Sequence, residues 1–79
     1  MMTLYVKTGC PHCKKVLDYA AENSIQFELK NVADPGVYEE LVSIGGKRQE
    51  PFLIDHEAAV SMYEAADIIA YLDQKVHQG

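Results

Sequence analysis

The feature that most constrains this chain is a pair of cysteines two residues apart, in the run Gly9-Cys10-Pro11-His12-Cys13. The run follows a β-prone segment that we interpret as a buried strand over residues 2–7, and Pro11 suits the first turn of a helix. A helix N-terminus presents free N–H groups and the positive end of a dipole, so it favours a thiolate at Cys10. In such motifs the thiol pKa falls from about 8.5 to roughly 3.5–7.5. We predict that Cys10 attacks a disulfide and that Cys13, more buried and one turn further on, resolves the product.

Other uses of the two cysteines are less well supported by the sequence. A buried structural pair conflicts with the exposed turn that Gly-Cys-Pro favours. A zinc site needs four ligands, and only the histidines could supplement the pair, so no metal site is predicted. His12 lies inside the motif, where it either tunes the thiolate and contacts a ligand or is an exposed spacer. An iron–sulfur cluster that bridges two chains at Cys10 stays conceivable.

Hydrophobic periodicity along the chain predicts the order β-α-β-α-β-β-α, an α/β fold with a four-stranded mixed sheet flanked by helices. The first helix has one apolar stripe formed by Cys13, Val16, Leu17, Ala20 and Ala21. The alternation of Ile25, Phe27 and Leu29 predicts a second strand with one buried face. Asp34-Pro35 indicates the start of a second helix, which Gly45-Gly46 closes. Phe52–Ile54 and Ala58–Met62 predict a hairpin, and the last helix has an inner face of Ala65, Ile68, Ile69, Leu72 and Val76.

Length and charge limit the function further. With 79 residues there is room for one domain and a small core, so we expect a single domain over residues 1–79. The net charge of −5 argues against a nucleic-acid partner. We find no signal peptide and no apolar run that could cross a membrane, and therefore expect a monomeric cytoplasmic protein. The five cations expected near the motif could form a patch for an anionic ligand: Lys7, Lys14, Lys15, Lys47 and Arg48.

Three segments together resemble the glutaredoxins and, through them, the amino-terminal domain of glutathione transferases. They are the segment 7–13 with both cysteines, the segment 46–54 around Pro51, and the segment 62–72 that opens the last helix. The resemblance implies a thioredoxin-like fold and a glutaredoxin-like enzyme that reduces protein disulfides or glutathione mixed disulfides. Glutathione would be the co-substrate, with no bound cofactor.

The resemblance also implies a glutathione site. It implies a cis bond before Pro51, which places that loop beside Cys10, and backbone pairing between Glu50 and the cysteine part of glutathione. The N-terminus of the last helix, at Glu64 and Ala65, would receive the γ-glutamyl carboxylate. The remaining implied contacts are Lys7, His12 and Gln49, with Arg48 as an alternative to Gln49.

Two residues depart from the family pattern. Glu50 stands where a small apolar residue is usual, and Ala65 stands where a serine is usual. Both changes leave backbone contacts intact but put the affinity for glutathione in question. Two alternatives therefore stay open. One is a dithiol donor reduced by thioredoxin reductase, and the other is a non-catalytic module that binds glutathione or an iron–sulfur cluster.

Overall fold

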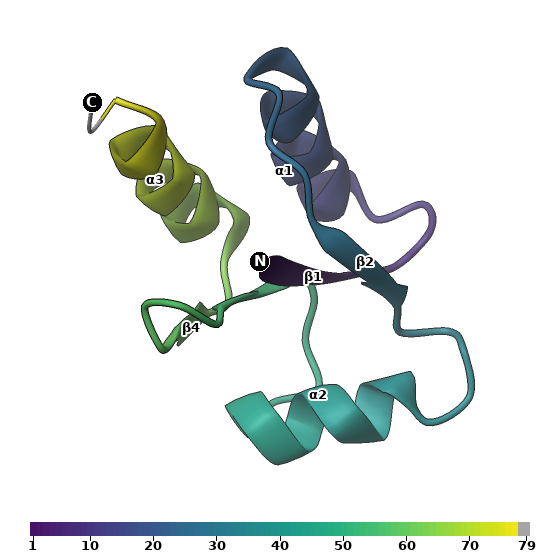
Figure 1. Ribbon diagram of the computed structural model, residues 1–79. Coiled ribbons are helices and arrows are strands. Elements are labelled where there is room, and N and C mark those ends of the chain that lie inside the picture. Colours follow the sequence, from purple (N-terminus) through teal and green to yellow (C-terminus); the bar gives the residue numbers. More distant parts are fainter. Residues whose placement is uncertain (78–79) are drawn as a thin grey trace.

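The computed structural model describes residues 1–77 and confirms the predicted order of elements. Strand β1 (Met2–Val6) is central, and it pairs in parallel with β2 (Glu28–Asn31) and antiparallel with β3 (Phe52–Asp55). Strand β4 (Val60–Met62) closes the hairpin, so the sheet order is β2-β1-β3-β4. Helices α1 (Pro11–Glu22) and α3 (Ala65–Val76) cover one face of the sheet, and α2 (Val37–Gly45) covers the other (Figure 1).

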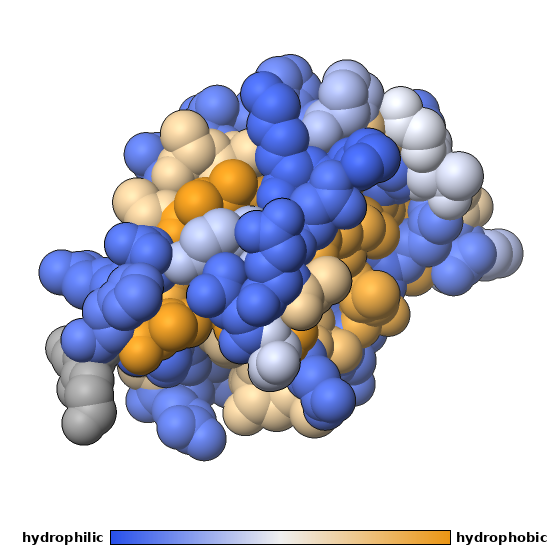
Figure 2. Space-filling view, turned by 90° about the horizontal axis from the view of Figure 1, so that it is seen from above, coloured by the Kyte–Doolittle hydropathy of each residue, from blue (hydrophilic) through white to orange (hydrophobic). Residues whose placement is uncertain are grey.

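Alternation along the two central strands divides the core into two layers. Leu4 and Leu53 point toward α1 and α3, where they pack with Val16, Ile68 and Leu72. The strand neighbours of these two residues, Tyr5 and Phe52, point the other way, where both pack with Leu41 of α2. Apolar atoms also reach the surface among the polar residues of the α1/α3 face (Figure 2). The first of these layers packs α1 and α3 against the central strands.

The first two elements differ in detail from the sequence prediction. β1 ends at Val6, one residue earlier than expected, and Ala21 of α1 is exposed. The predicted strand over 25–30 is only the segment Glu28–Asn31, and the side chain expected inside at Leu29 is 54% exposed. β2 is an edge strand with no further element beyond it. Ile25 and Phe27 still pack against the core, but from the connection that precedes the strand.

The later elements also begin or end at other residues than expected. Helix α2 starts at Val37 rather than at Asp34, because Pro35-Gly36 forms a turn and Gly36, with φ of 79°, caps the helix. Ala58 and Ala59 belong to the hairpin turn and not to β4, which begins at Val60. Val76, expected on the inner face of α3, is 40% exposed because it lies in the last turn. The C-terminal end of α2 is as predicted, with Gly46 as a left-handed cap.

Close packing at the end of α2 yields a first testable prediction. A Cβ atom added at Gly45 would lie 2.2 Å from the Tyr63 hydroxyl and 3.0 Å from a ring carbon of Phe52. We expect Gly45→Ala to lower the free energy of unfolding by about 1–3 kcal/mol, measured by urea denaturation. The double variant Gly45→Ala/Tyr63→Phe, which lacks the nearest atom, should recover part of that loss. An equally stable Gly45→Ala protein would show that α2 does not pack this closely.

Candidate active site

Cys10 is positioned by the start of α1. It is the N-cap residue of the helix, with extended backbone angles (φ −80°, ψ 116°), and Pro11 occupies the first turn. The backbone N–H of Cys13 donates to the Cys10 sulfur at 3.3 Å. This hydrogen bond and the positive end of the helix dipole both stabilise negative charge on the Cys10 sulfur. The first cysteine is therefore held at the N-terminus of α1, with its sulfur in contact with a backbone N–H of the helix.

The two cysteines differ in exposure as predicted. Cys13 is 1% exposed, whereas Cys10 is half-buried, and both thiols are free. Burial, and to a smaller extent the neighbouring Cys10, raise the pKa of the Cys13 thiol to about 12. Cys13 consequently stays protonated at neutral pH in the reduced protein. Within residues 1–77, no three His, Cys, Asp or Glu side chains are grouped in a way that could hold a metal ion.

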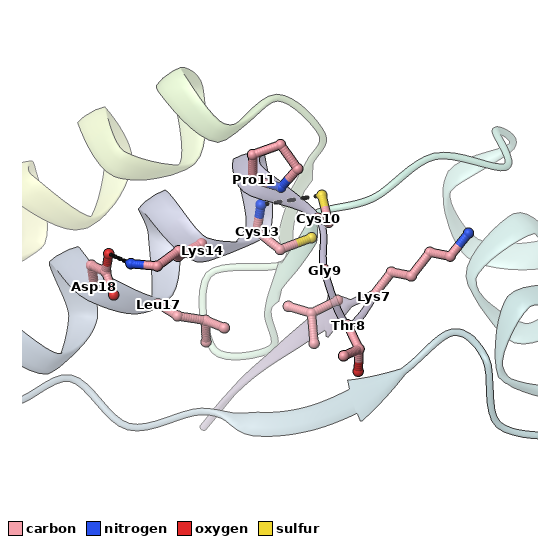
Figure 3. Close-up of a pocket in the computed structure, with 10 residues that line it drawn as sticks. Lys7, Thr8, Gly9, Cys10, Pro11, Cys13, Lys14, Leu17 and Asp18 are labelled. Atoms are coloured by element: carbon pink, nitrogen blue, oxygen red, sulfur yellow. Dashed lines mark hydrogen bonds and ion pairs between the residues drawn. The ribbon is translucent and has the colours of Figure 1, made fainter.

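A first pocket lies on one side of the motif, and we call it the α1 pocket (Figure 3). It has a volume of about 550 Å³. Its lining consists of residues 6–10 together with Pro11, Cys13, Lys14, Leu17 and Asp18. Lys14 is paired with Asp18 at 2.7 Å at the surface of α1. Both cysteines thus border a cavity large enough for part of a substrate.

A second, smaller pocket of about 230 Å³ contains most of the residues expected to bind glutathione, and we call it the proline pocket. Its lining residues are His12, Gln49, Glu50, Pro51, Glu64 and Ala65. The bond between Glu50 and Pro51 is cis, which confirms that prediction. Because His12 lies between the two cysteines in the sequence, the proline pocket adjoins the cysteine motif. Six of the seven side chains implied by the resemblance therefore lie together.

Of the seven residues that the resemblance implies as glutathione contacts, Lys7 lines the α1 pocket and not the proline pocket. It is exposed, and its side chain extends away from the cysteine pair, whereas Lys14 extends in the opposite direction (Figure 3). Arg48 lies with its guanidinium 4.1 Å from the centre of the Tyr38 ring. The cations near the motif therefore do not form the single patch that the sequence suggested. A contact between Lys7 and glutathione stays a prediction.

Tyr38 of α2 is a site residue that the sequence analysis missed. Its hydroxyl donates a hydrogen bond to the carboxylate of Glu50, and this bond raises the pKa of Tyr38 to about 12. The sequence signal at Tyr38 was only its place in the apolar stripe of α2. Tyr38 and Glu50 are twelve residues apart and a loop lies between them, so no sequence pattern predicts their contact. The structure thus shows how the unusual acid before Pro51 is held.

The N-terminus of α3 borders the proline pocket through a strained residue. Glu64 is the N-cap of α3 and has φ of 63°, a region that non-glycine residues rarely adopt. Its side chain does not cap the helix, and instead it accepts a hydrogen bond from the Gln49 amide at 3.0 Å. Such strain is common at functional sites, where surrounding contacts hold it. The arrangement leaves the start of α3 facing the pocket.

Comparison with known proteins decides the family. The model of the glutathione S-transferase N-terminal domain matches residues 4–78. The chain belongs to this family. A glutathione S-transferase from the Antarctic clam Laternula elliptica has 27% identity and a TM-score of 0.81 over 95% of this chain and 35% of that chain. No protein matched in the search of curated sequences.

Two further transferase-like structures were solved with glutathione compounds. Ure2p in complex with glutathione has 26% identity and a TM-score of 0.81, over 98% of this chain and 34% of that chain. The transferase URE2P6 from Phanerochaete chrysosporium, in complex with oxidised glutathione, has 28% identity and a TM-score of 0.80, over 95% and 36%. This chain thus spans about a third of the length of these structures. The thioredoxin-like fold is established, and the transferase N-terminal domain is the family shown, rather than glutaredoxin.

The two cysteines of this transferase-family protein lie in different environments. We therefore predict that the two thiols differ in reactivity. We expect iodoacetamide at pH 7–8 to label Cys10 but not Cys13 in the folded, reduced protein, as read by mass spectrometry. Cys13 is buried and its pKa of about 12 keeps it protonated at that pH. In urea both thiols should react, which serves as the control. A doubly labelled native protein would contradict the proposed difference between the two thiols.

Proposed function

We propose that this transferase-family domain is a glutathione-dependent thiol–disulfide oxidoreductase of the glutaredoxin type. It would act as a single domain in the reducing cytoplasm. The observation that carries the proposal is the position of the Cys10 sulfur at the N-terminus of α1, half-exposed beside two pockets, with the buried Cys13 thiol one turn away. No helix within residues 1–77 is long and apolar enough to cross a membrane.

The chemistry follows from this placement of the two thiols. The Cys10 thiolate attacks the glutathione sulfur of a mixed disulfide, a new S–S bond forms, and the substrate leaves as a thiolate that takes up a proton from water. A second glutathione thiolate then attacks the Cys10 mixed disulfide and yields oxidised glutathione. Alternatively, Cys13 loses its proton and attacks Cys10, which releases reduced glutathione and forms a Cys10–Cys13 disulfide. Two further glutathione molecules reduce that disulfide.

The proline pocket is the proposed docking site for glutathione. Its backbone at Glu50 would pair with the cysteine part of the tripeptide, and the N–H groups at the start of α3 would bind its γ-glutamyl carboxylate. The complexes of Ure2p and URE2P6 with glutathione compounds support this assignment. Because both proposed contacts use backbone groups, neither requires a small apolar side chain at position 50 or a hydroxyl at position 65.

Family membership favours a second candidate activity, the transfer of glutathione to an electrophile. Two assays of the purified protein separate the candidates. Reduction of a glutathione mixed disulfide is followed by NADPH consumption with glutathione reductase, and conjugation is followed with 1-chloro-2,4-dinitrobenzene. We expect the first activity to dominate. Three results would each overturn the proposal. They are disulfide reduction that is supported by thioredoxin reductase but not by glutathione, conjugation without disulfide reduction, and a brown protein with visible absorbance and no turnover.

A further inference from the structure

Glu50 carries a negative charge beside the cysteine motif. It precedes Pro51 in the wall of the proline pocket, and its carboxylate accepts a hydrogen bond from the Tyr38 hydroxyl. The carboxylate is also a minor cause of the raised pKa of the Cys13 thiol, after burial and Cys10. Glu50 therefore lies close enough to the cysteine motif for its charge to act on Cys13.

The charge of the proline pocket is not neutralised by the protein. Glu50 and Glu64 accept hydrogen bonds from uncharged groups, the Tyr38 hydroxyl and the Gln49 amide. Across residues 1–77, no cationic nitrogen lies within 4.0 Å of either carboxylate. Arg48, the cation nearest in sequence, lies over the Tyr38 ring. A ligand that enters the pocket thus meets two carboxylates that form no ion pair with residues 1–77, with His12 as the titratable cation in the lining.

We propose that Glu50 selects disulfides that carry a positive charge close to the scissile S–S bond, such as those of aminothiols or of cysteines flanked by lysine or arginine. The inference rests on the proposed attack by Cys10, in which one half of the disulfide bonds to the Cys10 sulfur and the other half leaves as a thiolate that water protonates. A cation within a few ångströms of Glu50 stabilises the approaching disulfide, and an anion at the same place is repelled. Tyr38 is the positioning residue that holds the carboxylate.

The test measures how fast Cys10 reacts with three small disulfides that differ in charge: cystamine (cationic), 2-hydroxyethyl disulfide (neutral) and 3,3′-dithiodipropionate (anionic). A Cys13→Ser background keeps the mixed disulfide at Cys10, and its formation is followed by mass spectrometry. We expect Glu50→Gln to lower the ratio of the cystamine to the dithiodipropionate rate constant by about tenfold. Comparing ratios between variants cancels the different leaving abilities of the thiols.

Two controls separate charge from structure. Glu39→Gln removes the same charge from an exposed residue of α2 that lines neither pocket, and should leave the ratio unchanged. Glu50→Asp keeps the charge and should retain most of the preference, which added salt should weaken. A peptide disulfide flanked by lysines, compared with one flanked by serines, distinguishes protein from small aminothiol substrates.

The outcomes distinguish this inference from the proposed function. An unchanged ratio in Glu50→Gln, or an equal change in Glu39→Gln, overturns the role of Glu50 even if the glutathione assay succeeds. A tenfold change of the ratio without glutathione-coupled turnover supports the role of Glu50 and overturns glutathione as the reductant. Failure of Cys10 to react with all three disulfides overturns both.

Discussion

Replacing Cys10 with serine is expected to lower the glutathione-coupled reduction of a mixed disulfide by at least about a thousandfold. A serine hydroxyl is almost fully protonated at neutral pH, and it cannot form the S–S bond on which the proposed cycle depends. The hydrogen bond from the Cys13 N–H and the position at the start of α1 do not compensate for the missing sulfur. The measurement is kcat/KM for a small glutathione mixed disulfide, coupled to NADPH oxidation.

Cys13→Ser is the matched variant for this prediction. It keeps the nucleophile and removes only the buried resolving thiol, so the one-thiol route through a second glutathione remains open. We expect it to reduce glutathione mixed disulfides within about tenfold of the wild-type rate, but to lose reduction of substrates that need the Cys10–Cys13 disulfide. A Cys10→Ser protein that still turned over would rule out the proposed nucleophile.

Replacing Asp55 with alanine is expected to cause the largest loss of stability. Asp55 is 1% exposed at the end of β3, where it accepts hydrogen bonds from the Tyr71 hydroxyl at 2.5 Å and from the Lys75 ammonium at 2.7 Å. It also accepts from the backbone of Ala58 in the hairpin turn. Its removal leaves donors of α3 and of the turn without a partner, which should lower the free energy of unfolding by about 2–4 kcal/mol. For a domain of this size, Tm should fall by roughly 10–25 °C.

The pH dependence of stability gives an independent check of the same group. The Lys75 and Tyr71 hydrogen bonds hold the pKa of Asp55 well below its usual range. The unfolded chain therefore takes up a proton at higher pH than the folded chain, so this stabilisation is complete above about pH 5 and is lost progressively below about pH 4. Asp55→Asn should flatten that part of the curve. Asp73→Ala, at an exposed carboxylate of α3, should leave Tm nearly unchanged and is the control. A Tm of Asp55→Ala close to the wild-type value would contradict the network.

Most of the fold follows from local sequence signals, as particular elements show. Cys13, Val16 and Ala20 recur at the helical period and are buried in α1, and the Gly45-Gly46 pair ends α2 where expected. These local signals fail at positions where segments distant in the sequence determine whether a side chain is buried. Leu29 alternates with polar residues as a buried strand residue would, but it lies on an edge strand and is exposed. Asp55 falls between the two strands of the predicted hairpin, but the structure places it at the end of β3, where its partners at positions 71 and 75 bury it.

In the candidate active site, too, some features can be predicted from the sequence and others depend on the tertiary structure. The order of the cysteines, the proline after Cys10 and the acid before Pro51 are all readable in the sequence. The contact between Tyr38 and Glu50 joins two elements through a loop, so no local period encodes it. The direction of the Lys7 side chain, which extends away from the cysteine pair, is likewise defined only by the packed structure, and its contact with glutathione stays a prediction.

The sequence alone therefore predicts the pair Cys10 and Cys13 as the centre of reactivity, because a helix start and a two-residue spacing are local properties of the chain. The tertiary structure decided everything that depends on distant segments. It made Cys13 a buried thiol that stays protonated at neutral pH, and it brought residues 49–51 and 64–65 into one pocket with His12. It also left the charge of Glu50 without a counter-cation, since Arg48 lies over Tyr38 instead. The burial of a side chain and the pairing of its charge depend on all the residues around it, and the fold determines which residues those are.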